Sequence, residues 1–413
     1  MTTSPVRVER AGGLGRTFNA LWSATGTANL GDAMYLMVLP LIALRLTSSA
    51  GLVAGVTVVL TLAWPAFGLH AGAVVDRVDR RRLIVAVNVV RALTLGVLTV
   101  LLLGDMMSIG WVYLAALVLG VGETLVDTAL AALVPPSVDR PENLDRANAR
   151  LEVAQNVTNQ FVGPPLAGLL AIVGLAAVTG VGALLFLATV PLLALMRGSF
   201  RARVATPAPE ARGGGGVTAG LRFLWRNRLL RNLTLLTAAM NVFWAAWTAV
   251  LVVYLVAPGP GHLSTAAYGV LLTTMAAGGI IGAALVVPLR RRLGDHLLLA
   301  VDVLGTIVLI GTPAVTTNPF AIGAAMAVGG AGSAVWRVIV GVIRQTVTPA
   351  ELLGRVYSAS RVISWGVLPV GAALGGLIAE LWTVRTVFVV GGLASVGLLL
   401  AYAVTVRPKD LAS

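Results

Sequence analysis

Long apolar runs separated by short clusters of charged residues make up most of the chain. Each run is close to 20 residues long, which is the helical length that crosses a hydrocarbon layer of about 30 Å. A transmembrane β-barrel would instead show short segments of alternating hydrophobicity. The pattern therefore predicts an all-α membrane protein with twelve transmembrane helices. The predicted spans are 20–44, 51–75, 83–104, 109–134, 152–173, 176–196, 232–257, 264–289, 297–316, 319–343, 357–381 and 384–405.

Composition supports this class and excludes several functions. Of the 413 residues, 57% are hydrophobic and only 11% are charged, whereas soluble domains carry about 25% charged residues. The chain has no Cys and three His, so we expect no disulfides, no metal site and no cofactor. It contains no G-x-x-x-x-G-K-[ST] segment, which argues against direct driving by ATP. Nothing in the sequence predicts an enzyme.

The distribution of positive charge predicts the orientation. The net charge is +13, and 26 of the 30 Lys and Arg residues lie in the even-numbered loops or near the termini. Cytoplasmic loops of membrane proteins carry such an excess. We therefore expect a multi-pass protein of the cytoplasmic (inner) membrane with both termini in the cytoplasm. Because topology explains the charge, nucleic-acid binding is not predicted.

A long loop divides the spans into two similar sets of six. The expected organisation is an N-terminal half (1–196), a cytoplasmic linker (197–231) and a C-terminal half (232–413). In the linker, Leu221, Leu224, Trp225 and Leu229 share a helical face, which predicts an amphipathic helix on the membrane surface, with a solvated linker as the alternative.

The two halves also repeat a motif. PENLDRANARLEV after the fourth span matches PAELLGRVYSASRV after the tenth, so Glu142 corresponds to Glu351 and Arg146 to Arg355, both 209 positions apart. Repeated halves are typical of secondary transporters, whose substrate site lies between them near the membrane midplane.

Five ionisable residues fall deep within predicted spans: Asp32, Arg91, Glu123, Asp127 and Arg337. Each costs roughly 2.5–3.5 kcal/mol at the centre of an inserted helix. They must therefore pair, face a polar cavity or be neutral. Asp302 lies only about five residues from the end of its predicted span, where we expect it to snorkel or pack.

The acidic members suggest proton coupling. Asp32 shares a helical stripe with Asn29, and a carboxyl group partly removed from water can bind and release a proton near neutral pH. Glu123 and Asp127 are spaced i, i+4, so one of them is expected to hold a proton. The alternative for each is a static pair with an arginine. Arg91 and Arg337 are the expected charge partners, and Arg337 is also a candidate for binding an anionic group.

Polar and aromatic residues of the spans are candidates for the substrate wall. An apolar pocket with a few polar groups suits an amphipathic compound, although such residues also pack between helices or anchor the interface. The candidates are Asn29, Asn156, Asn241, Trp244, Trp336 and Trp365.

The segment GAVVDRVDRRR between the second and third spans resembles the loop motif of the major facilitator superfamily, which reads roughly G-x-x-x-D-R-x-G-R-R. The matching residues are Gly72, Asp76, Arg77, Arg80 and Arg81, whereas Asp79 stands where the family usually has Gly. The resemblance implies two pseudo-symmetric six-helix halves and a latch that holds them in one conformation. A merely basic turn is the alternative.

VGPPLAGLL in the fifth span resembles the antiporter motif of drug-exporting members through Gly163, Pro164 and Gly168, with departures at Asn159 and Ala167. LGDAMYLMVLPLIALRLTSSA and LDRANA are similar to the subgroup that contains macrolide, tetracycline and enterobactin-type exporters. A helix kink is the alternative explanation of the Gly-Pro pair.

This resemblance implies a proton-coupled secondary active exporter, an antiporter of drugs or natural products that works by alternating access and could confer antibiotic resistance. The expected partners are a small amphipathic substrate, protons and the lipid bilayer, and we expect a monomer. Sodium stays open as a coupling ion. The alternatives are an importer or uniporter of a nutrient or lipid, and a membrane sensor or scaffold that transports nothing.

Overall fold

The computed structural model describes residues 14–196, 198, 200 and 216–408, and this part of the chain is built from helices without a named strand. The first group is α1 (Arg16–Leu46), α2 (Ala50–Val75), α3 (Arg80–Leu103), α4 (Ile109–Ser137), η1 (Pro141–Asn143), α5 (Leu144–Asn156), η2 (Val157–Val162), α6 (Gly163–Val173) and α7 (Leu175–Ala194). The second group is α8 (Gly216–Arg226), α9 (Arg228–Leu255), α10 (Thr265–Val315), α11 (Pro319–Val347), η4 (Ala350–Leu352), α12 (Leu353–Trp365), α13 (Leu368–Leu381) and α14 (Val384–Thr405).

These helices account for twelve crossings, which confirms the predicted fold class. Ten helical segments of the described chain are long and apolar enough to span a membrane. One of them, α10, turns back at Gly294, where φ is 73°, and therefore contributes two crossings. The remaining crossing combines α5, η2 and α6.

Two of the predicted spans are helical but are not continuous α-helices. The span at 152–173 contains a π-helical segment at Val157–Val162, and the span at 357–381 is interrupted between Trp365 and Leu368. Both interruptions lie in crossings with a proline one or two residues downstream, at Pro164 and Pro369, and a proline lacks the N–H that a continuous α-helix needs. The hydrophobic run shows only that a segment is apolar, and not where its backbone bonding changes.

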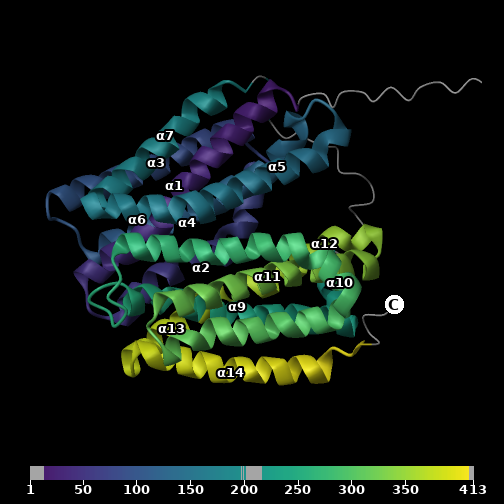
Figure 1. Cartoon of the computed structure of the whole chain (residues 1–413). Coiled ribbons are helices and arrows are strands. Elements are labelled where there is room, and N and C mark those ends of the chain that lie inside the picture. The colour runs from purple at the N-terminus through teal and green to yellow at the C-terminus, as the bar shows by residue number, and fades with distance from the viewer. Residues whose placement is uncertain (1–13, 197, 199, 201–215, 409–413) are drawn as a thin grey trace, which may run out of the picture.

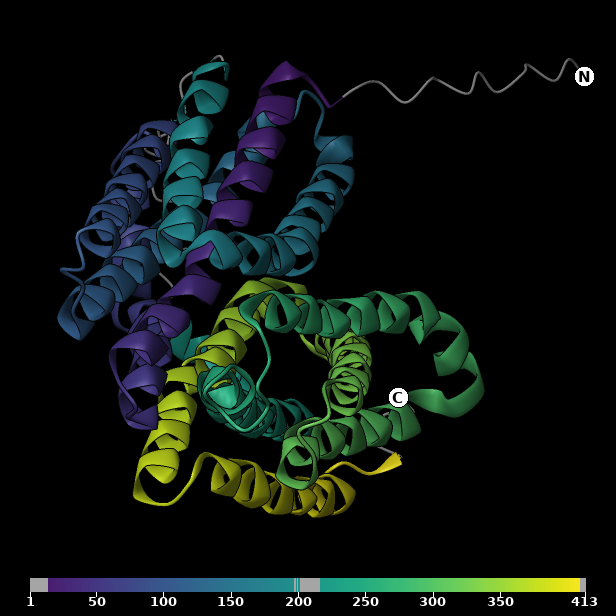
Figure 2. The same ribbon diagram turned by 60° about the vertical axis from the view of Figure 1, so that its left-hand side comes forward.

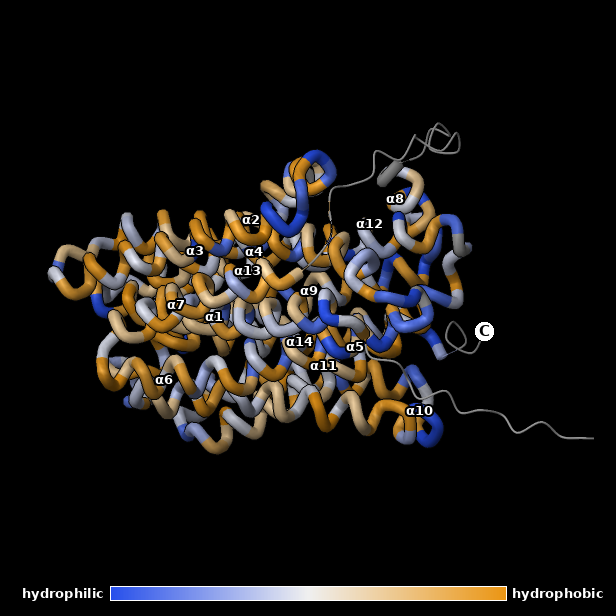
Figure 3. Tube along the Cα trace, turned by 90° about the horizontal axis from the view of Figure 1, so that it is seen from above, coloured by the Kyte–Doolittle hydropathy of each residue, from blue (hydrophilic) through white to orange (hydrophobic). Residues whose placement is uncertain are grey.

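The helices form two bundles, one from α1–α7 and one from α9–α14 (Figures 1 and 2). α1 begins, and α7 and α14 end, toward the same end of the bundles (Figure 1), and α8 lies toward this end as well (Figure 3). The loops at this end carry Arg77, Arg80–Arg82 and Arg290–Arg292, and we call it the arginine-rich end. Hydrophilic residues concentrate there (Figure 3). The other end of the bundles is called the outer end.

The buried apolar core shows where the two bundles meet. One cluster includes residues of both bundles, among them Tyr35 and Val53 of the first and Leu251 and Phe388 of the second. Toward the arginine-rich end there are two separate clusters, one in each bundle. The halves are therefore packed together at the outer end and have separate cores at the arginine-rich end.

The linker contains the predicted amphipathic helix, α8, but it is shorter than expected. Leu221 and Trp225 are 41% and 49% exposed, whereas Leu224 is buried against the second bundle. The helix ends at Arg226, and Asn227 caps α9 by accepting a hydrogen bond from the Leu230 N–H. Leu229 therefore belongs to the next helix. The linker residues 201–215 lie outside the described residues.

Candidate functional site

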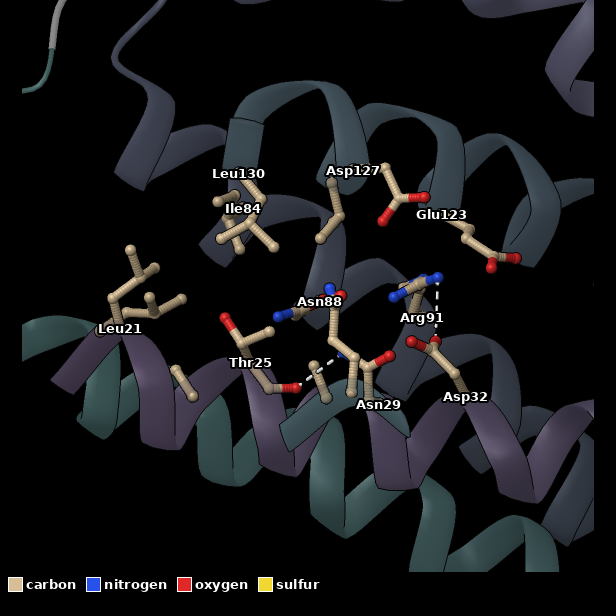
Figure 4. Close-up of a pocket in the computed structure, with 15 residues that line it drawn as sticks. Leu21, Thr25, Asn29, Asp32, Ile84, Asn88, Arg91, Glu123, Asp127 and Leu130 are labelled. Carbon is tan, nitrogen blue, oxygen red and sulfur yellow. Dashed lines mark hydrogen bonds and ion pairs between the residues drawn. The ribbon is translucent and has the colours of Figure 1, made fainter. Parts of the chain in front are cut away.

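Four of the five predicted buried charges meet in one pocket of the first bundle (Figure 4). Asp32 comes from α1, Arg91 from α3, and Glu123 and Asp127 from α4. Arg91 lies between the carboxyl of Asp32 on one side and those of α4 on the other (Figure 4). The other residues that line the pocket are Leu21, Ala24, Thr25, Ala28, Asn29, Ile84, Asn88, Val126, Leu130, Gln155 and Leu193.

Asp32 and Arg91 form a buried ion pair. Their closest atoms, Asp32 Oδ1 and Arg91 Nη2, are 3.1 Å apart, and the side chains are 9% and 1% exposed. The guanidinium carbon lies 4.9 Å from the ring centre of Phe186 and 5.8 Å from that of Tyr35. Gly122 leaves room for it, since a Cβ there would lie 3.0 Å from Arg91 Nε. None of the three guanidinium nitrogens has a hydrogen-bond partner among the described residues.

The two carboxyl groups of α4 are not paired with an arginine. Glu123 accepts a 2.7 Å hydrogen bond from the hydroxyl of Tyr35, and Asp127 is exposed toward the pocket. Sequence reasoning missed Tyr35, although its position three residues after Asp32 places it on the same side of α1. The static ion-pair alternative therefore describes Asp32 only.

The balance of charge determines what this pocket can do. Three carboxyl groups share one guanidinium, and Glu123 and Asp127 both act electrostatically on Arg91 along with Asp32. With all three ionised the group carries a net charge of −2. Such an excess in a poorly solvated site favours uptake of a proton or of a cationic ligand. The arrangement is suited to binding a charge reversibly.

An arginine of the second bundle also reaches this region. Arg361 of α12 lies over the ring of Trp64 of α2, with its guanidinium carbon 5.5 Å from the ring centre, and its charge acts on Asp127. Sequence reasoning counted Arg361 among the 26 Lys and Arg residues of the even-numbered loops and termini. Its place inside the predicted span 357–381 was the signal that could have identified it.

Arg337, the fifth ionisable residue deep within the predicted spans, lies in the other bundle. Its position on α11 is exposed, and it does not line this pocket. Its charge acts on Asp302. Asp302 itself is only 1% exposed and packs against Gly332. Of the two expectations for Asp302, snorkelling or packing, the structure shows packing, since its carboxyl lies against Gly332 of α11.

The proposed substrate-wall residues are not gathered in one place. Asn29 lines the pocket, with its Nδ2 donating to the Thr25 carbonyl at 2.9 Å, and Asn156 is exposed on α5. Asn241 donates to the Ser364 carbonyl at 2.6 Å. Trp336 is only 4% exposed.

The aromatic candidates differ in exposure. The indole N–H of Trp336 donates to the hydroxyl of Thr237 at 3.0 Å, so in this arrangement Trp336 packs between α9 and α11. Trp244 is half-buried, and Trp365 is 49% exposed. Substrate contact by these residues stays a prediction.

The segment that resembles the superfamily loop motif is bonded within the first bundle. Arg80 donates to the Ala132 carbonyl at 3.2 Å, and Arg81 donates to the carbonyls of Met196 and Ala194. Asp79, the departure from the motif, caps α3 by accepting from the Arg82 N–H at 3.0 Å. This explains how the turn forms without the usual glycine.

The other three motif positions are Gly72, Asp76 and Arg77. A Cβ at Gly72 would have no atom within 4 Å, so no close helix approach occurs there in this arrangement. Asp76 and Arg77 take part in no ion pair among the described residues. Among the described residues, no hydrogen bond or ion pair joins the proposed latch residues to the opposite half.

The residues that resemble the antiporter motif lie at close helix contacts, one within the first half and two between the halves. Gly163 packs against Ala33 of α1. Gly168 packs against the start of α10, and the carbonyl group of Pro164 contacts Gly269 of the same helix. The three positions therefore serve close packing at the outer end in this arrangement.

This packing gives a direct test. In Gly168→Ala, the new Cβ would lie 2.8 Å from the Thr265 oxygen and 3.0 Å from the Ala266 Cα, and overpacking of this kind costs about 1–3 kcal/mol. We expect a lower unfolding temperature in detergent. The control is Gly397→Ala on α14, where a Cβ has no atom within 4 Å and Ala favours the helix. Equal unfolding temperatures for the two variants would contradict the packing argument.

No group of three or more His, Asp or Glu residues in the described part of the chain could hold a metal ion. The chemistry of the pocket therefore comes from its carboxyl groups and Arg91.

Comparisons with known proteins show what this chain is similar to. A family model described as transmembrane secretion effector matches residues 14–412. The enterobactin exporter EntS of Salmonella typhi is 30% identical over 354 residues, which cover 84% of this chain and 82% of that protein. The multidrug efflux pump Tap of Mycolicibacterium fortuitum is 26% identical over 407 residues, which cover 94% and 95%.

Solved structures show the same fold at lower identity. The nucleoside transporter NupG has a TM-score of 0.74 at 12% identity, covering 95% of this chain and 99% of that one. A bacterial homologue of the iron transporter ferroportin, in an inward-facing state, has a TM-score of 0.72 at 17% identity, covering 96% and 100%.

Proposed function

Because the chain belongs to the transmembrane secretion effector family of the major facilitator superfamily, we propose that it exports a small amphipathic compound in exchange for protons. The arginine-rich end faces the cytoplasm, as the excess of positive charge favours, and the outer end faces away from it. Both termini are then cytoplasmic, and the protein resides in the inner membrane. Both relatives described above are exporters, one of enterobactin and one of multiple drugs.

The observation that carries the proposal is the group of three carboxyls around one guanidinium. Asp32 is paired with Arg91, whereas no arginine of the described part of the chain lies within ion-pair distance of Glu123 or Asp127. Proton uptake by this group lowers its net negative charge and weakens the hold of the carboxyls on Arg91. A proton therefore changes the interactions of α1, α3 and α4, which is what coupling requires.

Alternating access provides the rest of the cycle. The halves are joined at the outer end and have separate cores at the arginine-rich end, so the described arrangement is open to the cytoplasm. Substrate binds from the cytoplasm, the halves rock, and substrate leaves outside while a proton enters. Return and proton release restore the starting charge. A ligand shifts such an equilibrium only by its different affinity for the two states.

Arg361 is suited to report the charge of the site to the other half. It belongs to α12, and its charge acts on Asp127 across the boundary between the bundles. When Asp127 is ionised the two side chains attract each other, and when it is protonated the attraction is lost. The state of one half thereby affects the position of the other.

Transport in inverted membrane vesicles tests the proposal. With an acidic lumen, we expect substrate to accumulate inside and protons to leave, for at least one compound in a panel of siderophores, macrolides and lipids. Vesicles that contain the Asp127→Asn variant should lose the coupled proton flux. Right-side-out vesicles and a sodium gradient provide the comparisons.

Four outcomes would contradict the proposal. Uptake in right-side-out vesicles alone would indicate an importer, movement without any ion gradient would indicate a uniporter, and dependence on sodium would replace the coupling ion. Absence of transport across the whole panel would favour a sensor or scaffold.

A further inference from the structure

A carboxylate of the second bundle binds the start of a helix in the first. Glu380, at the outer end of α13, accepts a 2.8 Å hydrogen bond from the Ser49 hydroxyl and a 3.0 Å hydrogen bond from the Gly51 N–H. Both bonds end on the same oxygen, Oε2. Gly51 is the second residue of α2, and its N–H has no acceptor within the helix.

Ser49 orders this helix end for the carboxylate. Its hydroxyl oxygen accepts a 3.1 Å hydrogen bond from the Leu52 N–H, as a helix N-cap does, while its proton is donated to Glu380. The positive end of the α2 dipole therefore faces a negative charge. Tyr113 of α4 steadies the same turn through a 2.8 Å bond from its hydroxyl to the Leu52 carbonyl.

The backbones approach closely beside this contact. At Gly51 a Cβ would lie 3.3 Å from Glu380 Oε2, and at Gly376 it would lie 2.8 Å from the Cβ of Ala54. Among the described residues, two hydrogen bonds join the two halves, and both are made by Glu380. The two ion pairs of the described residues each lie within one half. At the outer end, the contact places a charge in a boundary that is otherwise mainly apolar, whereas Arg361 and Trp64 make the other charged contact between the halves.

We propose that Glu380 and the Ser49–Gly51 turn form an outer latch, which holds the two halves together at the outer end and must release each time the protein opens there. The two bonded groups belong to different halves, so rocking separates them. In the state that is open at the outer end, the Glu380 carboxylate and the start of α2 no longer bind each other, and both form hydrogen bonds with water instead. The latch therefore sets the balance between the two states without contacting the transported compound.

Distances measured with paired spin labels test the latch. The chain has no Cys, so Val173→Cys and Phe320→Cys introduce the two attachment sites. These residues are 83% and 86% exposed and lie at the outer ends of α6 and α11, in different halves. Glu380→Gln keeps the size of the side chain and removes its charge. We expect the population with the longer label distance to rise about fivefold, the effect of a carboxylate at an exposed helix N-terminus.

Two further single variants and one double variant complete the experiment. Ser49→Ala should shift the distances in the same direction, and its combination with Glu380→Gln should shift them by less than the sum of the single effects. Asp105→Asn, the control, removes an exposed carboxylate from the outer loop between α3 and α4 and should leave the distances unchanged.

An unchanged distance distribution in both Glu380→Gln and Glu380→Ala would overturn the latch, as would an equal shift in Asp105→Asn. The measurement uses the full chain in lipid nanodiscs without substrate or ion gradient. Its result therefore stands apart from whether the protein exports a compound.

Discussion

Asp32→Asn is expected to abolish proton-driven efflux and to leave the fold intact. The asparagine has nearly the same size as aspartate but cannot take up and release a proton. Arg91 would keep its position because Glu123 and Asp127, which also act on its charge, remain. Efflux should therefore fall to the level of vesicles without the protein, while the unfolding temperature changes little.

The measurement is substrate-dependent proton flux in proteoliposomes, with thermal unfolding of the same preparation. Asp302→Asn is the matched control, since it makes the same substitution at a buried carboxyl outside the pocket. Full coupled transport by Asp32→Asn would remove Asp32 from the proton-binding role. An equal loss of coupled transport in Asp302→Asn would show that the effect is not specific to the carboxyl of the pocket.

Arg91→Leu is expected to be the most destabilising single change in the pocket. It removes the one arginine that, among the described residues, lies within ion-pair distance of Asp32, and it leaves three carboxyl groups near one another in the pocket. Loss of one partner from a buried ion pair costs about 3–5 kcal/mol. We expect a clear fall in unfolding temperature and poor recovery of the protein from membranes.

Addition of Asp32→Asn to Arg91→Leu should restore part of the lost stability, since it removes one of the unpaired carboxylates. Thermal unfolding of the two single variants and the double variant in one detergent measures this interaction. If the double variant were no more stable than Arg91→Leu alone, the ion pair between Asp32 and Arg91 would not be the reason for the loss.

The hydrophobic pattern was sufficient for the fold class because membrane insertion depends on local properties. A run such as 384–405 is apolar over the length of one crossing, and the structure has α14 at Val384–Thr405. The sequence does not show how a crossing is bonded internally. The π-helical turn at Val157–Val162 precedes a position, Gly163, that packs against Ala33 of α1, a residue distant in the sequence.

The sequence also identified most of the site. Charged residues inside apolar runs are costly, so Asp32, Arg91, Glu123 and Asp127 were recognisable one by one. Their assembly into a single group was not, because it depends on how α1, α3 and α4 pack. Tyr35 was missed because a tyrosine in a membrane span has no unusual local cost, whereas Arg361 was missed although it lies inside the predicted span 357–381.

By itself, the sequence determined that this protein spans a membrane with twelve helices in two similar halves, and that a few of its buried residues are ionisable. These properties follow from the transfer of each residue from water to lipid, which depends on local composition. Only the tertiary structure decided that Arg91 pairs with Asp32, that Asp302 packs against Gly332, and that Glu380 binds the start of α2. Each is a contact between helices, and its partner is fixed by distance in space, which the order of residues along the chain does not reveal.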